Sequence, residues 1–165
     1  MSILQVILLI FSPVLALTFG SNSSASISTA GADVQRKDDL SRFMTAANDY
    51  QSNNYGKTPW DSGTTQSKFV RRYIDEKCTA ETPEKTDNNC GDQFRDPDGT
   101  PYHFAYKGEL KKNSTVSVKQ DHGIHVYTYA YCGDEDGELI RGSGKRSYAM
   151  LYKLSNGSIA CNDNH

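Results

Sequence analysis

The feature that most constrains this chain is its N-terminal segment, which carries no charged residue from position 1 to position 32. Residues 3–19 form an apolar run that is interrupted only by Gln5, Ser12, Pro13 and Thr18. A membrane-spanning helix needs about 20 apolar residues, so the run is slightly short for a retained anchor. A cleaved signal peptide also stays open, although no Lys or Arg precedes the run and only weak cleavage-site candidates occur, around Ser24 and Ala25.

The length and net charge of the whole chain limit the number of domains and the kinds of partner that it can have. The 165 residues have room for one compact domain. Because 18 Lys and Arg face 20 Asp and Glu, the net charge is −2, and no basic surface for nucleic acid is predicted. We therefore expect a hydrophobic segment with a polar connector at residues 1–32 and a globular head at residues 33–165.

Four cysteines follow the apolar segment, at Cys78, Cys90, Cys132 and Cys161. An even number behind an export-like segment indicates an oxidising compartment and two disulfides. The sequence permits three pairings. We favour Cys78 with Cys90, closing a polar loop, and Cys132 with Cys161, tying the end of the chain to a strand. Zinc is disfavoured because the chain has no close C-x-x-C pair.

Helical periodicity predicts two helices. Apolar residues recur at helical spacing between charged ones in the first, which should end near Gly56, before Pro59. Its apolar positions are Leu40, Phe43, Met44, Ala47 and Tyr50. The uncharged stretch 21–32 before it is typical of a linker. A second, short helix is expected at residues 66–77, and residues 79–99, rich in Pro, Asp and Asn, should form a surface loop.

Beyond Pro101 the pattern changes to the period of two that is typical of strands. We expect strands at 102–106, 115–119, 123–132, 146–154 and 158–161, joined as an antiparallel meander, with turns at 134–137 and 155–157. In the longest strand, alternation places Ile124, Val126, Thr128, Ala130 and Cys132 on one face. His125, Tyr127, Tyr129 and Tyr131 lie on the other, which we expect to be partly exposed or covered by a loop. The predicted fold is α+β, with a helix laid across a small antiparallel sheet.

Several motifs resemble a known family. The sequences QRKDDLSRF at 35–43 and YQSNNYGKTP at 50–59 resemble the helix region of bacterial type IV pilins. DPDGTPY at 96–102 is similar to the turn that leads into the sheet of pilins and type II secretion pseudopilins, and RSYAMLYKL at 146–154 resembles the last long strand of pilins. The resemblance covers most of the chain and implies a pilin-like αβ-roll, in which a long N-terminal helix is apolar in its first half and amphipathic in its second.

The resemblance also implies a role. A protein of this kind is a membrane-anchored structural subunit with an extracytoplasmic head, found at the cell surface or in an extracellular filament used for attachment, motility or DNA capture. Its partners would be other pilin subunits, the membrane and the pilus assembly machinery. In the family a Glu stands at the fifth mature position, whereas this chain has Gln5 at its fifth position. The membrane and assembly helix would include Ile3, Leu4, Gln5, Val6, Ile7, Leu8, Leu9, Ile10 and Phe11.

Candidate chemical sites are few. His122 and His125 lie three apart on a predicted strand and should face opposite ways, so we expect surface histidines rather than a shared site. Asp96 and Asp98 imitate the start of a calcium loop, but the later Glu of such a loop is missing, which favours a plain turn over a weak calcium site. No catalytic residues and no cofactor are predicted, so we expect no enzyme. The alternative function is a secreted or membrane-tethered ligand-binding protein with residues 1–20 as signal peptide.

Overall fold

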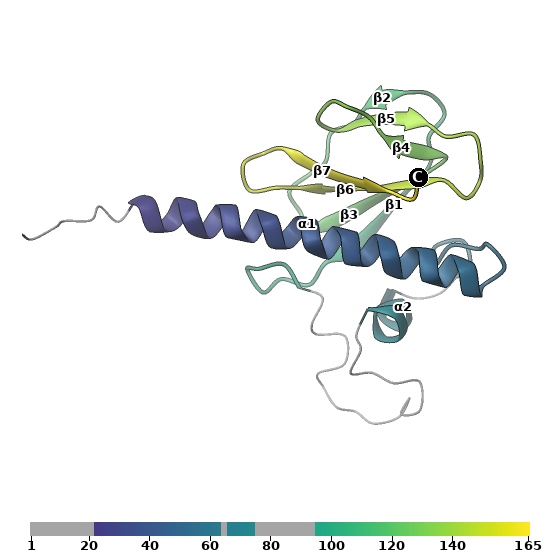
Figure 1. Cartoon of the computed structure of the whole chain (residues 1–165), viewed down its shortest axis with the longest axis horizontal. Coiled ribbons are helices and arrows are strands. Elements are labelled where there is room, and N and C mark those ends of the chain that lie inside the picture. Colours follow the sequence, from purple (N-terminus) through teal and green to yellow (C-terminus); the bar gives the residue numbers. More distant parts are fainter. Residues whose placement is uncertain (1–21, 64–65, 75–94) are drawn as a thin grey trace, which may run out of the picture.

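The computed structural model describes residues 22–63, 66–74 and 95–165 of the chain. In this part, one long helix, α1 (Asn22–Asn53), packs on a four-stranded sheet, and a three-stranded sheet covers the other face of the first. Figure 1 shows these three layers, with the N-terminal turns of α1 projecting beyond the sheets. The α+β class and the packing of the helix on a sheet are therefore confirmed.

Helix α1 buries the stripe that its sequence predicts. Leu40, Phe43, Met44, Ala47 and Tyr50 are all buried. The helix ends at a left-handed turn, where Tyr55 and Gly56 have φ of 55° and 78° and the Gly56 N–H donates to the Gln51 carbonyl. The linker predicted over 21–32 is wrong from Asn22 onward, where the chain is already helical. No proline interrupts this stretch, so a helix stabilised downstream can extend through it.

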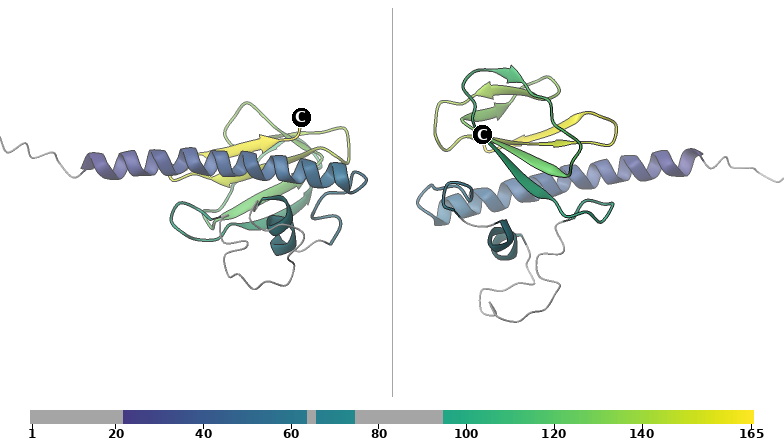
Figure 2. Two further views of the ribbon diagram at one scale, coloured as in Figure 1. Left: turned by 60° about the horizontal axis from the view of Figure 1, so that its bottom comes forward. Right: turned by 180° about the vertical axis from the view of Figure 1, so that it is seen from behind.

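The second helix, α2 (Gln66–Tyr73), packs beside the C-terminal half of α1, as Figure 2 shows from two further sides. Phe69 is buried against Phe43 of α1, with ring centroids 5.2 Å apart in an edge-to-face arrangement. Val70 and Ile74 are buried as well. The predicted helix is confirmed to Tyr73; residues 75–77 and most of the predicted loop, 79–94, lie outside the described residues.

The four-stranded sheet has the order β1-β3-β6-β7 and is mixed. Its strands are β1 (His103–Glu109), β3 (Gly123–Thr128), β6 (Tyr148–Lys153) and β7 (Ile159–Asp163). The predicted antiparallel meander is wrong, because β1 pairs with β3 in parallel, whereas β3–β6 and β6–β7 are antiparallel. Residues 110–122 carry the chain back through the second sheet, so β3 starts at the same end as β1.

The three-stranded sheet has the order β2-β5-β4 and consists of β2 (Ser114–Thr115), β5 (Glu138–Arg141) and β4 (Ala130–Cys132). The strand predicted over 123–132 is split at Tyr129, whose φ of 55° turns the chain from one sheet into the other. Tyr127, Tyr129 and Tyr131 are half-buried. Both β5 and the break were missed, because a four-residue strand and a single left-handed residue leave little trace in a pattern of period two.

Strand β6 is the centre of the molecule because both of its faces are buried. Tyr148, Met150 and Tyr152 contribute to the core under α1, while Ala149 and Leu151 contribute to the core between the two sheets. All five are at most 5% exposed. The period-two alternation that predicted this strand therefore separates two apolar cores instead of a core from solvent.

The turns around β6 and β5 follow their predicted chemistry. The β6–β7 hairpin closes where the Leu154 N–H donates to the Ser158 carbonyl, and Gly157 has a φ of 90°. The predicted turn at 134–137 joins β4 to β5, with the Glu138 N–H donating to the Glu135 carbonyl. Both turns are confirmed.

Candidate functional site

The turn at residues 95–101 leads into the sheet and presents one carboxylate to the long helix. Arg95 and Pro101 form a bridge, the Asp96 N–H donates to the Thr100 carbonyl, and the Gly99 N–H donates to the Asp96 carbonyl. Gly99 has a φ of 88°, a conformation that side chains rarely adopt. The DPDG segment thus forms the predicted turn, and the chain enters β1 directly after it.

Asp96 forms a bidentate ion pair with Arg36 of α1. Arg36 Nε donates to Asp96 Oδ2 and Arg36 Nη2 to Asp96 Oδ1, both at 2.7 Å. The Asp96 side chain is 0% exposed and that of Arg36 is 10% exposed. Arg36 Nη1 also donates to Asp33 and to the Ser155 hydroxyl, and Asp33 Oδ1 accepts the Ser155 N–H at 2.9 Å. We call Arg36, Asp96, Tyr152, Asp33 and Ser155 the Asp96 network; it joins α1, the 95–101 turn and the β6–β7 hairpin.

The hydrogen bonds of the Asp96 network stabilise the charged form of Asp96. Tyr152 donates its hydroxyl to Asp96 Oδ2 at 2.7 Å, and the Asp98 N–H donates to Oδ1 at 3.1 Å. Burial by itself raises the pKa of Asp96, but the hydrogen bonds from Arg36, Tyr152 and Asp98 outweigh burial and lower it to about 2. The bond with Asp96 is in turn the main reason that the pKa of Arg36 is raised.

A second buried carboxylate lies one turn of α1 further on. Asp39 is 6% exposed and accepts a hydrogen bond from the Tyr102 hydroxyl at 3.2 Å. Burial raises the pKa of Asp39, against the opposing effect of the Tyr102 bond. The Tyr102 ring packs edge-to-face on the Tyr152 ring, with centroids 5.4 Å apart. Tyr102, which binds Asp39, and Tyr152 of β6, which binds Asp96, are therefore in contact with each other.

The lowered pKa of Asp96 predicts an acid-dependent part of the stability. An unfolded Asp titrates near 3.9, so Asp96 stabilises the fold at pH values above about 4, and this contribution is lost as the pH falls toward 2. The loss should be about 2 kcal/mol. Urea unfolding of the protein and of the Asp96→Asn variant between pH 5 and pH 2 measures it. The variant should lack this part of the acid dependence, and the exposed-site variant Asp98→Asn should keep it.

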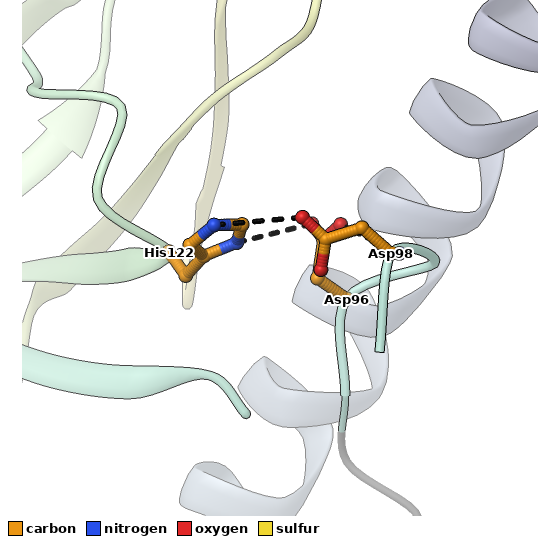
Figure 3. A group of neighbouring side chains, drawn as sticks. All are labelled: Asp96, Asp98 and His122. Atoms are coloured by element: carbon orange, nitrogen blue, oxygen red, sulfur yellow. Dashed lines mark hydrogen bonds and ion pairs between the residues drawn. The ribbon is translucent and has the colours of Figure 1, made fainter. Parts of the chain in front are cut away.

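His122 lies beside the two aspartates of the turn, as Figure 3 shows. His122 Nε2 is 3.5 Å from Asp98 Oδ2, and His122 Nδ1 is 3.8 Å from Asp96 Oδ2 and 3.5 Å from the Tyr152 hydroxyl. His122 has a φ of 57° and directly precedes β3, which begins at Gly123. Within the described ranges, Asp96, Asp98 and His122 are the one group of three potential metal ligands whose donor atoms lie within 4.8 Å of one another.

The hydrogen bonds of Asp96 argue against a cation at this group. Each Asp96 oxygen already accepts two hydrogen bonds, including one each from the Arg36 guanidinium, so a metal ion would have to displace a buried arginine. The geometry is that of an ion pair that fastens helix to head. The weak calcium site at Asp96 and Asp98 stays a prediction, and the plain turn expected in its place is what the chain forms.

The other predicted histidine, His125, lies apart from this group. His122 and His125 do not share a site, as expected from their spacing, but the prediction that both are surface residues is wrong for His125, which is 4% exposed. The reason is that β3 meets an apolar core on both faces: Ile124 and Val126 lie in the core under α1, and Tyr127 packs against the core between the two sheets. His125 Nε2 is 3.9 Å from Asp121 Oδ1.

The predicted disulfide between Cys132 and Cys161 is confirmed and joins β4 to β7. The Cys132 N–H also donates to Asp163 Oδ2 at 2.7 Å, so two contacts fasten β7 to the second sheet. Cys78 and Cys90 lie outside the described residues, and so do the assembly-helix residues 3–11.

Open grooves lie along α1, and two of them share Lys37. One, of about 350 Å³, lies between α1 and β7 and is lined by residues that include Lys37, Leu40 and Ile159. The other, of about 380 Å³, lies nearer the N-terminus of α1 and includes Val34, whose exposed fraction is 60%. Neither α1 nor α2, in the parts that the structure describes, is long and apolar enough to cross a membrane.

The partners of Asp96 were not predicted from the sequence. Arg36 is 60 residues away from Asp96 and Tyr152 is 56 residues away, and nothing local in the chain marks either as its partner. The burial of His125 could have been predicted, since it stands between Ile124 and Val126 in a segment whose two faces both lack charged residues.

No protein-family model, curated protein or solved structure matches the chain.

Proposed function

We propose that the chain is a structural subunit of a type IV pilus or pseudopilus, polymerising through its N-terminal helix for surface attachment, motility or DNA capture. The observation that carries the proposal is the division of α1 into two parts. From Asp33 onward the helix is fastened to the head by the Asp96 network and by its apolar stripe, whereas its N-terminal turns project beyond the sheets (Figure 1).

A projecting helix suits assembly by packing. The 32 residues of α1 span about 48 Å. The uncharged residues 1–21 precede it in the sequence, and stacking such segments from many copies would bury them together while the heads face water. The partners in this proposal are other pilin subunits, the membrane and the assembly machinery, and the location is the membrane and the cell surface.

The head supports the same role. The DPDGTPY turn, which carries the resemblance to pilins, receives Arg36 from the helix, so the motif holds the helix at a fixed position on the sheet. The disulfide between Cys132 and Cys161 suits a head outside the cytoplasm. A fixed helix and a stapled head would give each copy the same shape, which a regular polymer needs.

The proposal predicts that filaments sheared from producing cells contain the full chain. Val34 is exposed on α1 near its projecting end, so Val34→Asp should leave the head folded and place an unpaired charge in the helix packing. We expect the variant to enter sheared filaments at least about tenfold less than the unaltered chain. Quantitative immunoblotting of the sheared and membrane fractions measures the effect.

The matched control is Tyr55→Asp. Tyr55 is 98% exposed and lies in the turn at the opposite end of α1, so this variant should assemble normally. Absence of the unaltered chain from both the filament and the membrane fractions would overturn the proposal. A mature protein that begins downstream of residue 20 and stays monomeric would support the alternative, a secreted ligand-binding protein.

A further inference from the structure

Buried histidine His125 has no hydrogen-bond partner for either ring nitrogen in the part of the chain that the structure describes. It is 4% exposed and lies on β3, in register with Ala105 of β1 on one side and Leu151 of β6 on the other. A neutral imidazole tolerates this environment better than an imidazolium, because a buried charge without a hydrogen bond is strongly disfavoured. The carboxylate oxygen Asp121 Oδ1 lies 3.9 Å from His125 Nε2, beyond hydrogen-bond distance. A protonated ring would therefore have to move toward Asp121 or reach water.

The basic groups around His125 lie on the β1 side of β3 and not at its β6 neighbour in register. Lys107 and His103, both on β1, disfavour its protonation, and Asp121, in the loop before β3, favours it. From β6 the neighbour in register is the apolar Leu151. Burial is the main reason that the pKa of His125 is lowered, and Lys107 is the second. A proton on His125 would thus create repulsion across the β1–β3 pairing rather than across β3–β6.

Strand β1 is the neighbour of His125 that is most easily released. It is an edge strand, most of its residues are exposed or half-buried, and its pairing with β3 is interrupted by a register shift between Tyr106 and Gly108. On its outer side the Gln66 side chain bonds to the Tyr102 carbonyl and to the Phe104 N–H, so one side chain takes the place of a neighbouring strand. By contrast, β6 is central and β7 is joined to β4 by a disulfide.

We propose that His125 is an acid-sensitive switch in the sheet: its protonation opens the pairing of β1 with β3, while α1, β6 and β7 stay together. The folded state binds the proton less readily than an unfolded or opened chain, in which a histidine titrates near pH 6.5. The pairing is therefore fully stable above about pH 6.5 and weakens as the pH falls below it. An opened β1 would expose the backbone edge of β3 to a second strand.

Amide hydrogen exchange of the full-length oxidised protein, corrected for intrinsic exchange rates, tests the switch at pH 7.5 and pH 5. We expect the opening of β1, read at the amides that bond to β3, to increase at least about tenfold at pH 5. The amides of β6 and β7 should change much less. His125→Phe, which keeps a planar ring but cannot be protonated, should abolish the increase, and Lys107→Gln should reduce it.

His122→Gln is the matched control, since it removes the neighbouring half-buried histidine and should leave the opening of β1 unchanged. If His125→Phe does not fold, NMR titration of the His125 ring in the unaltered protein replaces it, and the ring must titrate together with the opening of β1. An unchanged acid response in His125→Phe, a ring that does not titrate with the opening, or an equal opening of all four strands would each overturn the proposal.

Discussion

Replacement of Arg36 by Met should lower the free energy of unfolding by about 3–5 kcal/mol at pH 7. Methionine keeps most of the apolar stem of the side chain but removes the guanidinium. Asp96, whose side chain is 0% exposed, would then lose the partner that accounts for two of its four hydrogen bonds. Removing one member of a buried ion pair is costly because the other charge stays buried without compensation. Urea unfolding followed by circular dichroism measures the change.

The control for this prediction is Arg42→Gln. Arg42 also pairs with an aspartate, Asp39, but its side chain is 56% exposed and the distance is 3.4 Å. Although Asp39 is buried, the Arg42 guanidinium lies largely in solvent and Asp39 keeps its hydrogen bond from Tyr102. The pair should therefore contribute about 1 kcal/mol or less, and Arg36→Met should cost several times as much free energy of unfolding as Arg42→Gln. The double variant Arg36→Met with Asp96→Asn should recover part of the loss, because no unpaired charge remains. Equal effects of Arg36→Met and Arg42→Gln would show that the Asp96 network does not hold α1 to the head.

The parts of the fold that were predicted correctly are those with a local physical cause. The buried apolar stripe from Leu40 to Tyr50 follows from the helical period. The end of α1 at Gly56 and the hairpin turn at Gly157 follow from the freedom of glycine to adopt positive φ. The DPDG turn is likewise defined by neighbouring residues. In each case the residues that determine the conformation lie within a few positions of one another.

The parts that were missed depend on residues far apart in the chain. The parallel pairing of β1 with β3 depends on where the chain goes between them, and residues 110–122 carry no signal that distinguishes a hairpin from a return through a second sheet. Tyr129 adopts a φ of 55° because its N–H donates to the Ser147 carbonyl and its own carbonyl accepts from Gly142. Tertiary contacts of this kind override the local preference of a residue.

In the candidate site, too, the local turn was predicted from the sequence, whereas the long-range partner of Asp96 was not. Local sequence placed Asp96 and Asp98 in one turn, which made a calcium loop the natural comparison. The partner that decides the chemistry of Asp96 is Arg36, and it approaches only because α1 crosses the sheet at that point. A motif seen without its long-range partner suggests a cation ligand, whereas the same motif with Arg36 forms a structural ion pair.

Replacement of both Cys132 and Cys161 by serine should lower the free energy of unfolding by about 3–4 kcal/mol. The two cysteines are 29 positions apart, and joining them restricts the unfolded chain more than a short loop would. Urea unfolding of the oxidised protein and of the variant measures the difference. Using the variant rather than a reductant leaves Cys78 and Cys90 unaltered, so the change reports on the confirmed disulfide alone.

The effect should also be concentrated at one edge of the fold. Without the disulfide, β7 would be joined to β4 by the Asp163 side chain and to β6 by its strand pairing. As the edge strand of its sheet, β7 should exchange its amides faster than β3 or β6, and the groove that it forms with α1 should open. An unfolding free energy within about 1 kcal/mol of the oxidised protein would contradict this prediction. β7 lies beside α1, where the Asn162 side chain donates to the Ser41 hydroxyl. Under the proposed pilin function, loosening β7 should therefore weaken the attachment of the helix to the head that assembly requires.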